Sequence, residues 1–198
     1  MNLHLVPNDP SKAVLMSDDG VVQYRITTRR KHLFCTPVCQ IFRSPAPSRP
    51  PTEDRLVAEI EWKRWSHPIV RSDVFDGTML EMEVREFLYK LGRKFSTTRY
   101  FLGSDDKEYC WKDIKGVAQI LTARESKANV ARFSYQTSRA DHFPTQKRYF
   151  LQIEPTTLDI DMLVITFIIM EKRRREREAH PDGDEAPFES GFDGAVAA

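Results

Sequence analysis

Short stretches in which apolar and polar residues alternate, separated by turn residues, fill the chain up to about residue 153. In residues 56–62, Leu, Ala, Ile and Trp alternate with Val and Glu, a pattern typical of a strand with one buried face. Residues 17–20 (Ser-Asp-Asp-Gly) and 76–77 (Asp-Gly) separate such stretches and are typical of hairpin turns. The pattern therefore predicts about ten short antiparallel strands before residue 154.

The expected strands cover residues 13–16, 21–27, 33–42, 56–62, 69–75, 78–82, 97–102, 108–112, 117–121, 129–135 and 149–153. Pro37 interrupts one of them, which favours an edge strand or a bulge there. One segment departs from the strand pattern, because the apolar residues of 84–91 have helical spacing and Gly92 follows as a stop. We expect a short helix in this segment.

The most hydrophobic segment begins at Leu158, and every residue from Met162 to Met170 is apolar except Thr166. A helix that is apolar on all sides must be surrounded by the rest of the protein. The apolar part rises roughly 20 Å at about 1.5 Å per residue, whereas a bilayer core needs about 30 Å. The segment is therefore predicted to be a core helix rather than a membrane span.

Both ends of this segment support a helix over about residues 157–178. Thr156 and Asp159 have the spacing of a capping box. The basic residues 172–177 lie where the helix dipole favours positive charge. The alternative is a buried strand, because residues 164–169 all favour strands. The charged continuation contains no turn residue before 181–183 (Pro-Asp-Gly), which favours one long helix.

The strands and the helix together predict a mainly β fold, an antiparallel barrel of about ten to twelve strands closed round the C-terminal helix. The barrel would provide the surroundings that the apolar helix requires. The predicted structural core contains Leu158, Met162, Leu163, Val164, Ile165, Phe167, Ile168, Ile169, Trp62 and Trp111.

Length and charge add the domain organisation. The 198 residues predict one domain over residues 1–178, with a flexible loop at 44–54 and a disordered acidic tail at 179–198. Residues 181–198 hold five acids and no Lys or Arg. The rest of the chain has 30 bases and 24 acids, a net charge of +6, so we expect a modest preference for anionic surfaces.

The first eight residues carry no secretory signal, and the three cysteines are an odd number. Both observations predict free thiols and an intracellular, cytoplasmic protein, with peripheral membrane association as the alternative. His32, Cys35 and Cys39 match no zinc spacing, and the acidic turns lack the ligand pattern of a calcium loop. We expect no metal and no cofactor.

Basic residues cluster at five places in the sequence, and these clusters are the candidate site for a lipid headgroup or another anion. The candidate residues are Arg29, Arg30, Lys31, Lys63, Arg64, Arg93, Lys94, Lys147, Arg148, Lys172 and Arg173. The alternative is that they are solvated strand ends and a solvated helix terminus, since charged runs usually face water.

Other classes of function find little support in the sequence. No nucleophile elbow, phosphate-binding loop, zinc-protease motif or dinucleotide-binding fingerprint is present, so no catalytic residue is assigned. His67 and His142 lie in expected loops, where a histidine is more often exposed than catalytic. The sequence contains no nucleic-acid-binding motif.

Four segments carry a family resemblance. They are residues 17–27 (SDDGVVQYRIT), 58–62 (AEIEW), 98–112 (TRYFLGSDDKEYCWK) and 163–172 (LVITFIIMEK). In order and spacing they resemble a family of basidiomycete fungal proteins known only as a domain of unknown function, over most of residues 3–175. That family is similar to the tubby-like group, with the plant LURP-one-related proteins and the phospholipid scramblases. The resemblance implies a barrel closed round a hydrophobic helix and implies no catalytic residues.

The sequence thus predicts a non-catalytic binding module whose partner is an anionic membrane lipid, similar to a phosphoinositide. A protein-interaction or scaffold domain, recruited through exposed aromatic residues or the tail, is the second hypothesis. An enzyme of unknown class is the third.

Overall fold

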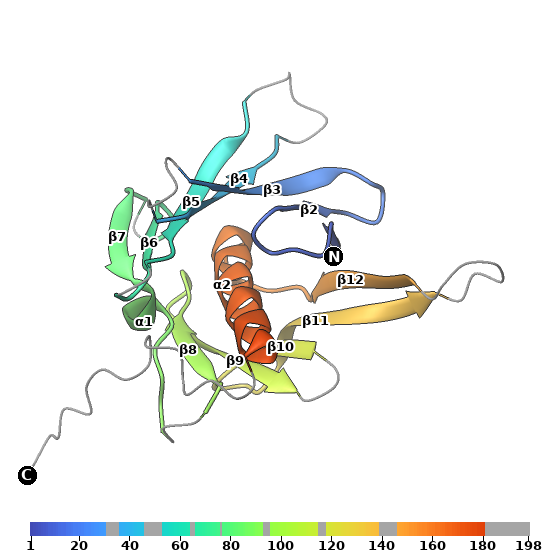
Figure 1. Cartoon of the computed structure of the whole chain (residues 1–198). Coiled ribbons are helices and arrows are strands. Elements are labelled where there is room, and N and C mark those ends of the chain that lie inside the picture. The colour runs from blue at the N-terminus through green and yellow to red at the C-terminus, as the bar shows by residue number, and fades with distance from the viewer. Residues whose placement is uncertain are drawn as a thin grey trace, which may run out of the picture.

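The chain forms one twelve-stranded antiparallel sheet that curls round a C-terminal helix (Figure 1). This computed structural model describes residues 1–30, 36–45, 53–63, 66–75, 77–92, 96–114, 118–138 and 146–180. The mainly β class and the C-terminal helix are as predicted from the sequence.

Two meanders make up the sheet. The first contains β1 (Asn2–Val6), β2 (Ala13–Met16), β3 (Val22–Arg29), β4 (Val38–Arg43), β5 (Arg55–Glu61), β6 (Ile69–Ser72) and β7 (Leu80–Glu83). After α1 (Val84–Phe87), the second contains β8 (Arg99–Leu102), β9 (Glu108–Ile114), β10 (Ala118–Ala123), β11 (Asn129–Ser138) and β12 (Gln146–Ile153). The helix α2 (Ile160–Ala179) follows. Pairing of β1 with β12 joins the two meanders into one sheet.

The strand β1 was not predicted, although its sequence has the expected alternation. Leu3 and Leu5 are buried, whereas Asn2 and His4, which alternate with them, are only partly buried. Leu3 lies opposite Leu151 of β12, so the register places two apolar side chains on the inner face of the sheet. The short length of β1 and its place at the chain start hid this signal.

The predicted closure into a barrel is not confirmed. The edge strands β7 and β8 do not pair with each other in the described part of the chain. The segment that includes α1 lies between them, and Tyr89 bridges to Tyr100 of β8. The ring of Phe87 packs between those of Phe75 and Phe101, with centroids 4.9 and 6.1 Å away. Apolar packing therefore covers the gap where strand pairing is missing.

The helix α2 begins at Ile160, three residues later than expected. Asp159 is the N-cap, and its carboxylate accepts hydrogen bonds from the backbone nitrogens of Asp161 (2.6 Å) and Met162 (3.2 Å). The prediction of a capping box from Thr156 was wrong. The Thr156 hydroxyl instead accepts a hydrogen bond from the Leu158 nitrogen (3.1 Å), before the helix starts.

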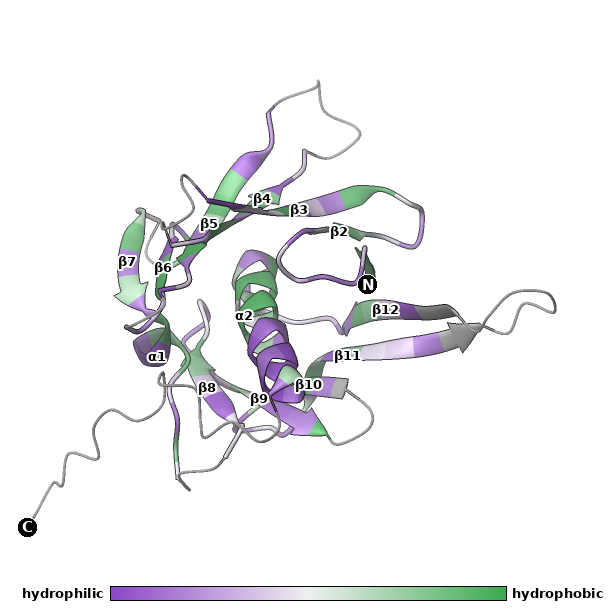
Figure 2. Cartoon of the chain, in the orientation of Figure 1, coloured by the Kyte–Doolittle hydropathy of each residue, from purple (hydrophilic) through white to green (hydrophobic). Residues whose placement is uncertain are grey.

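The first half of α2 is enclosed by the sheet, and the second half is polar (Figure 2). All residues from Asp161 to Glu171 are buried. Phe167 packs against Phe133 of β11, with ring centroids 4.7 Å apart. No helix among the described residues is long and apolar enough to cross a membrane.

Of the residues expected in the core, those of α2 and its approach are buried, as is Trp111 of β9. The Trp111 indole donates a hydrogen bond to the Thr166 hydroxyl (3.0 Å), and that hydroxyl donates to the Leu163 carbonyl (2.9 Å). This pair satisfies the one polar side chain in the apolar run of α2. Trp62 is different, since it is only partly buried at the edge of the core.

Candidate anion-binding surface

Neighbouring strands run in opposite directions, so the connections between them lie at two opposite ends of the sheet. The odd-numbered strands of the first meander, and β9 and β11 of the second, finish at the end where the polar half of α2 emerges. Three contacts fix α2 there: Lys172 with Trp62 after β5, Arg175 with Asn8 after β1, and Arg177 with Asp113 of β9. We call this the basic end. The opposite end, where α2 begins, is called the acidic end.

Several of the predicted site residues come together at the basic end, although they are distant in sequence. Arg29 and Arg30 end β3, Lys63 follows β5, and Arg148 lies near the start of β12. Arg29 is opposite Val38 of β4, which is also opposite Glu61 of β5. The antiparallel pairing therefore gathers bases from three connections at one end of the sheet.

Apart from Lys112 near the end of β9, five basic residues at this end form no ion pair with another described residue, and we call these five the basic rim. They are Lys12, Arg29, Arg30, Lys63 and Arg148. Lys63 is partly buried and the other four are exposed. Lys12, which precedes β2, was not among the predicted site residues because it stands alone in the sequence rather than in a cluster.

The remaining predicted residues divide into two groups. Lys31, Arg64, Arg93 and Lys94 lie outside the described residues, as does the side chain of Lys147. Lys172 and Arg173 are described but lie inside α2. Lys172 pairs with Glu176 (3.0 Å) and lies 4.9 Å above the Trp62 ring, while Arg173 is only 8% exposed. Lys172 is therefore already paired and Arg173 is buried, so neither belongs with the unpaired residues of the basic rim.

The charged end of α2 is largely neutralised by its own acids. Glu171 is fully buried, and both its carboxylate oxygens accept hydrogen bonds from Arg174 at 2.8 Å. Arg175 also donates to Glu171 (2.7 Å). These hydrogen bonds raise the pKa of Arg174 above its usual value. Because a buried carboxylate requires such partners, this basic run stabilises the helix rather than offering free positive charge.

Two aromatic side chains lie at the same end of the sheet as Arg148, on the opposite face. Tyr135 of β11 is 41% exposed, and its ring centroid is 5.7 Å from that of Tyr149 of β12. Arg148 is the neighbour of Tyr149 in β12 and is opposite Gln136. Tyrosine and tryptophan are the side chains that prefer the boundary between water and lipid headgroups.

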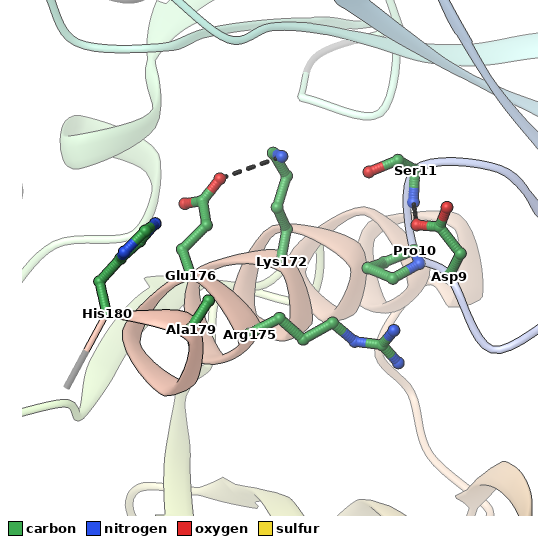
Figure 3. A pocket seen from close by; sticks show the side chains of 8 residues that line it. All are labelled: Asp9, Pro10, Ser11, Lys172, Arg175, Glu176, Ala179 and His180. Atoms are coloured by element: carbon green, nitrogen blue, oxygen red, sulfur yellow. Dashed lines mark hydrogen bonds and ion pairs between the residues drawn. The ribbon is translucent and has the colours of Figure 1, made fainter.

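A pocket of about 290 Å³ also opens at the basic end, between α2 and the connection that follows β1 (Figure 3). Its lining includes Lys172 and Arg175, but also Asp9 and Glu176. Lys172 points toward Glu176 and pairs with it, while Asp9, Pro10 and Ser11 lie on the other side of the pocket. Positive and negative groups are balanced, so the pocket itself has little preference for an anion.

The acidic end has the opposite character. Apart from the helix N-cap Asp159, five exposed acids there form no ion pair with another described residue: Asp19, Glu53, Asp106, Glu125 and Glu154. All five lie in, or directly border, connections at the end where α2 begins. Bases without an ion pair thus gather at one end and such acids at the other, with exceptions that include Asp9 in the pocket at the basic end and Lys127 beside Glu125 at the acidic end.

A buried ion cluster at the acidic end holds the start of α2. Asp161 is 2% exposed and accepts hydrogen bonds from the Tyr24 hydroxyl (2.5 Å), Arg55 (2.5 Å) and Arg43 (3.1 Å). Burial and the adjacent carboxylate raise the pKa of Tyr24 well above its usual value. The carboxylate has all the partners that burial demands, so the cluster is structural. Sequence reasoning missed it because Asp161 is more than 100 residues from each of its three partners.

Metal binding and catalysis find no support in the described residues. No group of three or more His, Cys, Asp or Glu side chains there could hold a metal ion. Of the metal candidates, Cys39 is buried, and burial raises the pKa of its thiol to about 11; His32 and Cys35 lie outside the described residues. His67 contacts Arg85 (2.9 Å), which can only donate, and His142 also lies outside the described residues.

Known proteins resemble the chain over most of its length. The profile of a family of unknown function, DUF6593, matches residues 8–176. No curated protein sequence matches the chain. Among solved structures, the X-ray structure of a protein from Arabidopsis thaliana is similar, at 12% sequence identity and a TM-score of 0.37, over 88% of this chain and 91% of that chain. A TM-score this low carries no argument about fold or function.

Proposed function

Because the chain belongs to DUF6593, a family of unknown function, we propose its role from its surface: it is a non-catalytic module that binds anionic membrane lipid through the basic rim. The observation that carries the proposal is the gathering of bases without an ion pair at one end of the sheet. An anionic surface attracts that end, so the basic rim both binds the surface and orients the protein on it.

The neighbouring aromatic side chains support a lipid surface over a free anion. Tyr135 and Tyr149 place interfacial rings at the same end of the sheet as Arg148, on the opposite face. The balanced pocket gives no preference for a single phosphate in solution. We also propose that the curled sheet round α2 is a variant of the tubby-like barrel in which the α1 segment replaces one strand pairing, and that DUF6593 is a basidiomycete branch of that group.

The charge count sets the expected affinity. Each Lys or Arg near an anionic leaflet contributes about 1 kcal/mol, so the five residues of the basic rim contribute about 5 kcal/mol at most. That value corresponds to a Kd of about 0.2 mM, which describes reversible and salt-sensitive binding. The protein should therefore depend on a lipid-rich surface and not on a single headgroup.

Vesicle co-sedimentation tests the proposal. The full chain is mixed with phosphatidylcholine vesicles with and without phosphatidylserine or a phosphoinositide, at low and moderate salt. We expect pelleting only with the anionic lipids, and less of it at the higher salt. Absence of lipid-dependent pelleting at low salt would refute the proposal and favour the protein-interaction hypothesis.

Two matched double variants locate the surface. Arg29→Gln with Arg30→Gln removes two charges from the basic rim, and we expect binding to weaken by about 2 kcal/mol, roughly thirty-fold. Lys127→Gln with Arg132→Gln removes two exposed charges away from the basic end. Because salt screens charges beyond about 10 Å, this control should bind almost as the parent does. Equal losses in the two variants would show that only net charge matters.

A further inference from the structure

The acidic segment 181–198 starts where the basic rim is found. The helix α2 ends at Ala179, and its C-cap His180 lines the pocket at the basic end. The segment lies outside the described residues, and its sequence holds Asp182, Asp184, Glu185, Glu189 and Asp193 with no Lys or Arg. Five acids thus begin beside five bases that have no acid partner in the described structure.

Length and tethering favour an encounter between them. Eighteen residues extend to at most about 60 Å, at roughly 3.3–3.6 Å each, so the segment reaches every base of the basic rim. A short tether holds a ligand at an effective concentration of about 1 mM. Weak electrostatic attraction is enough to populate a bound state under these conditions.

We infer that residues 181–198 bind the basic rim of their own chain and compete there with the anionic membrane surface. This inference rests on the proposed function for its consequence, because the segment then regulates lipid binding. A segment that binds with a Kd of about 0.1 mM, at an effective concentration of about 1 mM, weakens vesicle binding about tenfold. Removal of the negative charge of the segment should therefore strengthen vesicle binding about tenfold.

The test uses two full-length variants of equal net charge. The first neutralises the segment, with Asp182→Asn, Asp184→Asn, Glu185→Gln, Glu189→Gln and Asp193→Asn. The second neutralises five exposed acids of the acidic end, with Asp19→Asn, Glu53→Gln, Asp106→Asn, Glu125→Gln and Glu154→Gln. At one fixed salt concentration, we expect the first to bind phosphatidylserine vesicles about tenfold more tightly than the parent and the second to bind like the parent.

A second measurement needs no lipid. A labelled peptide of residues 181–198 is titrated with the neutralised-segment variant, and binding is followed by fluorescence anisotropy. We expect saturable, salt-sensitive binding that Arg29→Gln with Arg30→Gln weakens at least severalfold. Release of vesicle binding without any peptide binding would overturn the inference, because it would show that the segment only repels the membrane.

The two proposals fail in different ways. If no form of the protein binds vesicles but the peptide binds the basic rim, the proposed lipid function fails and the intramolecular contact stands. If parent and neutralised-segment variant bind vesicles equally and the peptide does not bind, the lipid function stands and this inference fails.

Discussion

Trp111 donates a hydrogen bond to Thr166, the one polar side chain in the apolar run of α2, and removal of this bond tests how the helix is held. Both residues are fully buried, and the indole nitrogen lies 3.0 Å from the Thr166 hydroxyl. Thr166→Val keeps the size of the side chain but leaves the indole N–H without an acceptor. A buried donor without a partner costs about 1–3 kcal/mol, so we expect the free energy of unfolding to fall by that amount.

A double-mutant cycle separates this bond from the effects of packing. Trp111→Phe removes the donor and leaves a smaller ring, so it destabilises the protein by itself. In that background Thr166→Val strands no donor, and we expect it to be nearly neutral. The coupling between the two positions should be about 1–2 kcal/mol, measured by urea unfolding followed by circular dichroism. Equal costs of Thr166→Val in the two backgrounds would refute the reasoning.

Three further predictions address the ends and the centre of the helix. Burial raises the pKa of Asp105, but hydrogen bonds from Thr157, Tyr109 and Lys107 outweigh it and lower this pKa to about 2 from its ordinary 3.8. The ionised Asp105 therefore contributes about 2 kcal/mol to the free energy of unfolding above pH 4. This contribution is lost as the pH falls through 2. In acid titrations Asp105→Asn should remove that dependence, and the exposed neighbour variant Asp106→Asn should retain it. Asp161→Asn should lower the free energy of unfolding in urea by about 2 kcal/mol. A fully buried pair would lose about 3–5 kcal/mol, but Arg43 and Arg55 are half exposed and regain water. An unchanged free energy of unfolding would show that the cluster is not structural. Phe167→Asp or Ile168→Asp should abolish soluble folding, and soluble variants with cooperative unfolding would contradict the enclosed helix.

Much of the fold could be predicted because alternation and apolar periodicity are local signals. The stretch 56–62 shows β5 directly, and Gly92 has the positive φ (+87°) that favours glycine, although α1 has already ended at Phe87. The run from Met162 to Met170 has no polar face to expose, so its enclosure follows from composition alone.

The remaining features depend on contacts between distant segments. The α1 helix ends at Phe87, four residues short of the expected Leu91, because Leu88 leaves the helical conformation (φ −111°, ψ 77°) and Tyr89 pairs with Tyr100. The basic rim exists because antiparallel pairing brings the ends of β3 and β5 and the start of β12 to the same side. Most residues of the basic rim lie in basic clusters that the sequence shows directly. The sequence could not show that Arg173, in another such cluster, is buried.

The pairing of β1 with β12 has a consequence for how the chain acquires its structure. Asn2 lies opposite Gln152, so β1 obtains its second neighbour only after nearly the whole sheet has been synthesised. The helix that fills the interior comes later still. A nascent chain must therefore hold seven strands of the first meander without their core, and sequence-distant contacts of this kind slow folding. Refolding in the millisecond-to-second range, with no stable fragment lacking α2, is the kinetic behaviour that this topology implies.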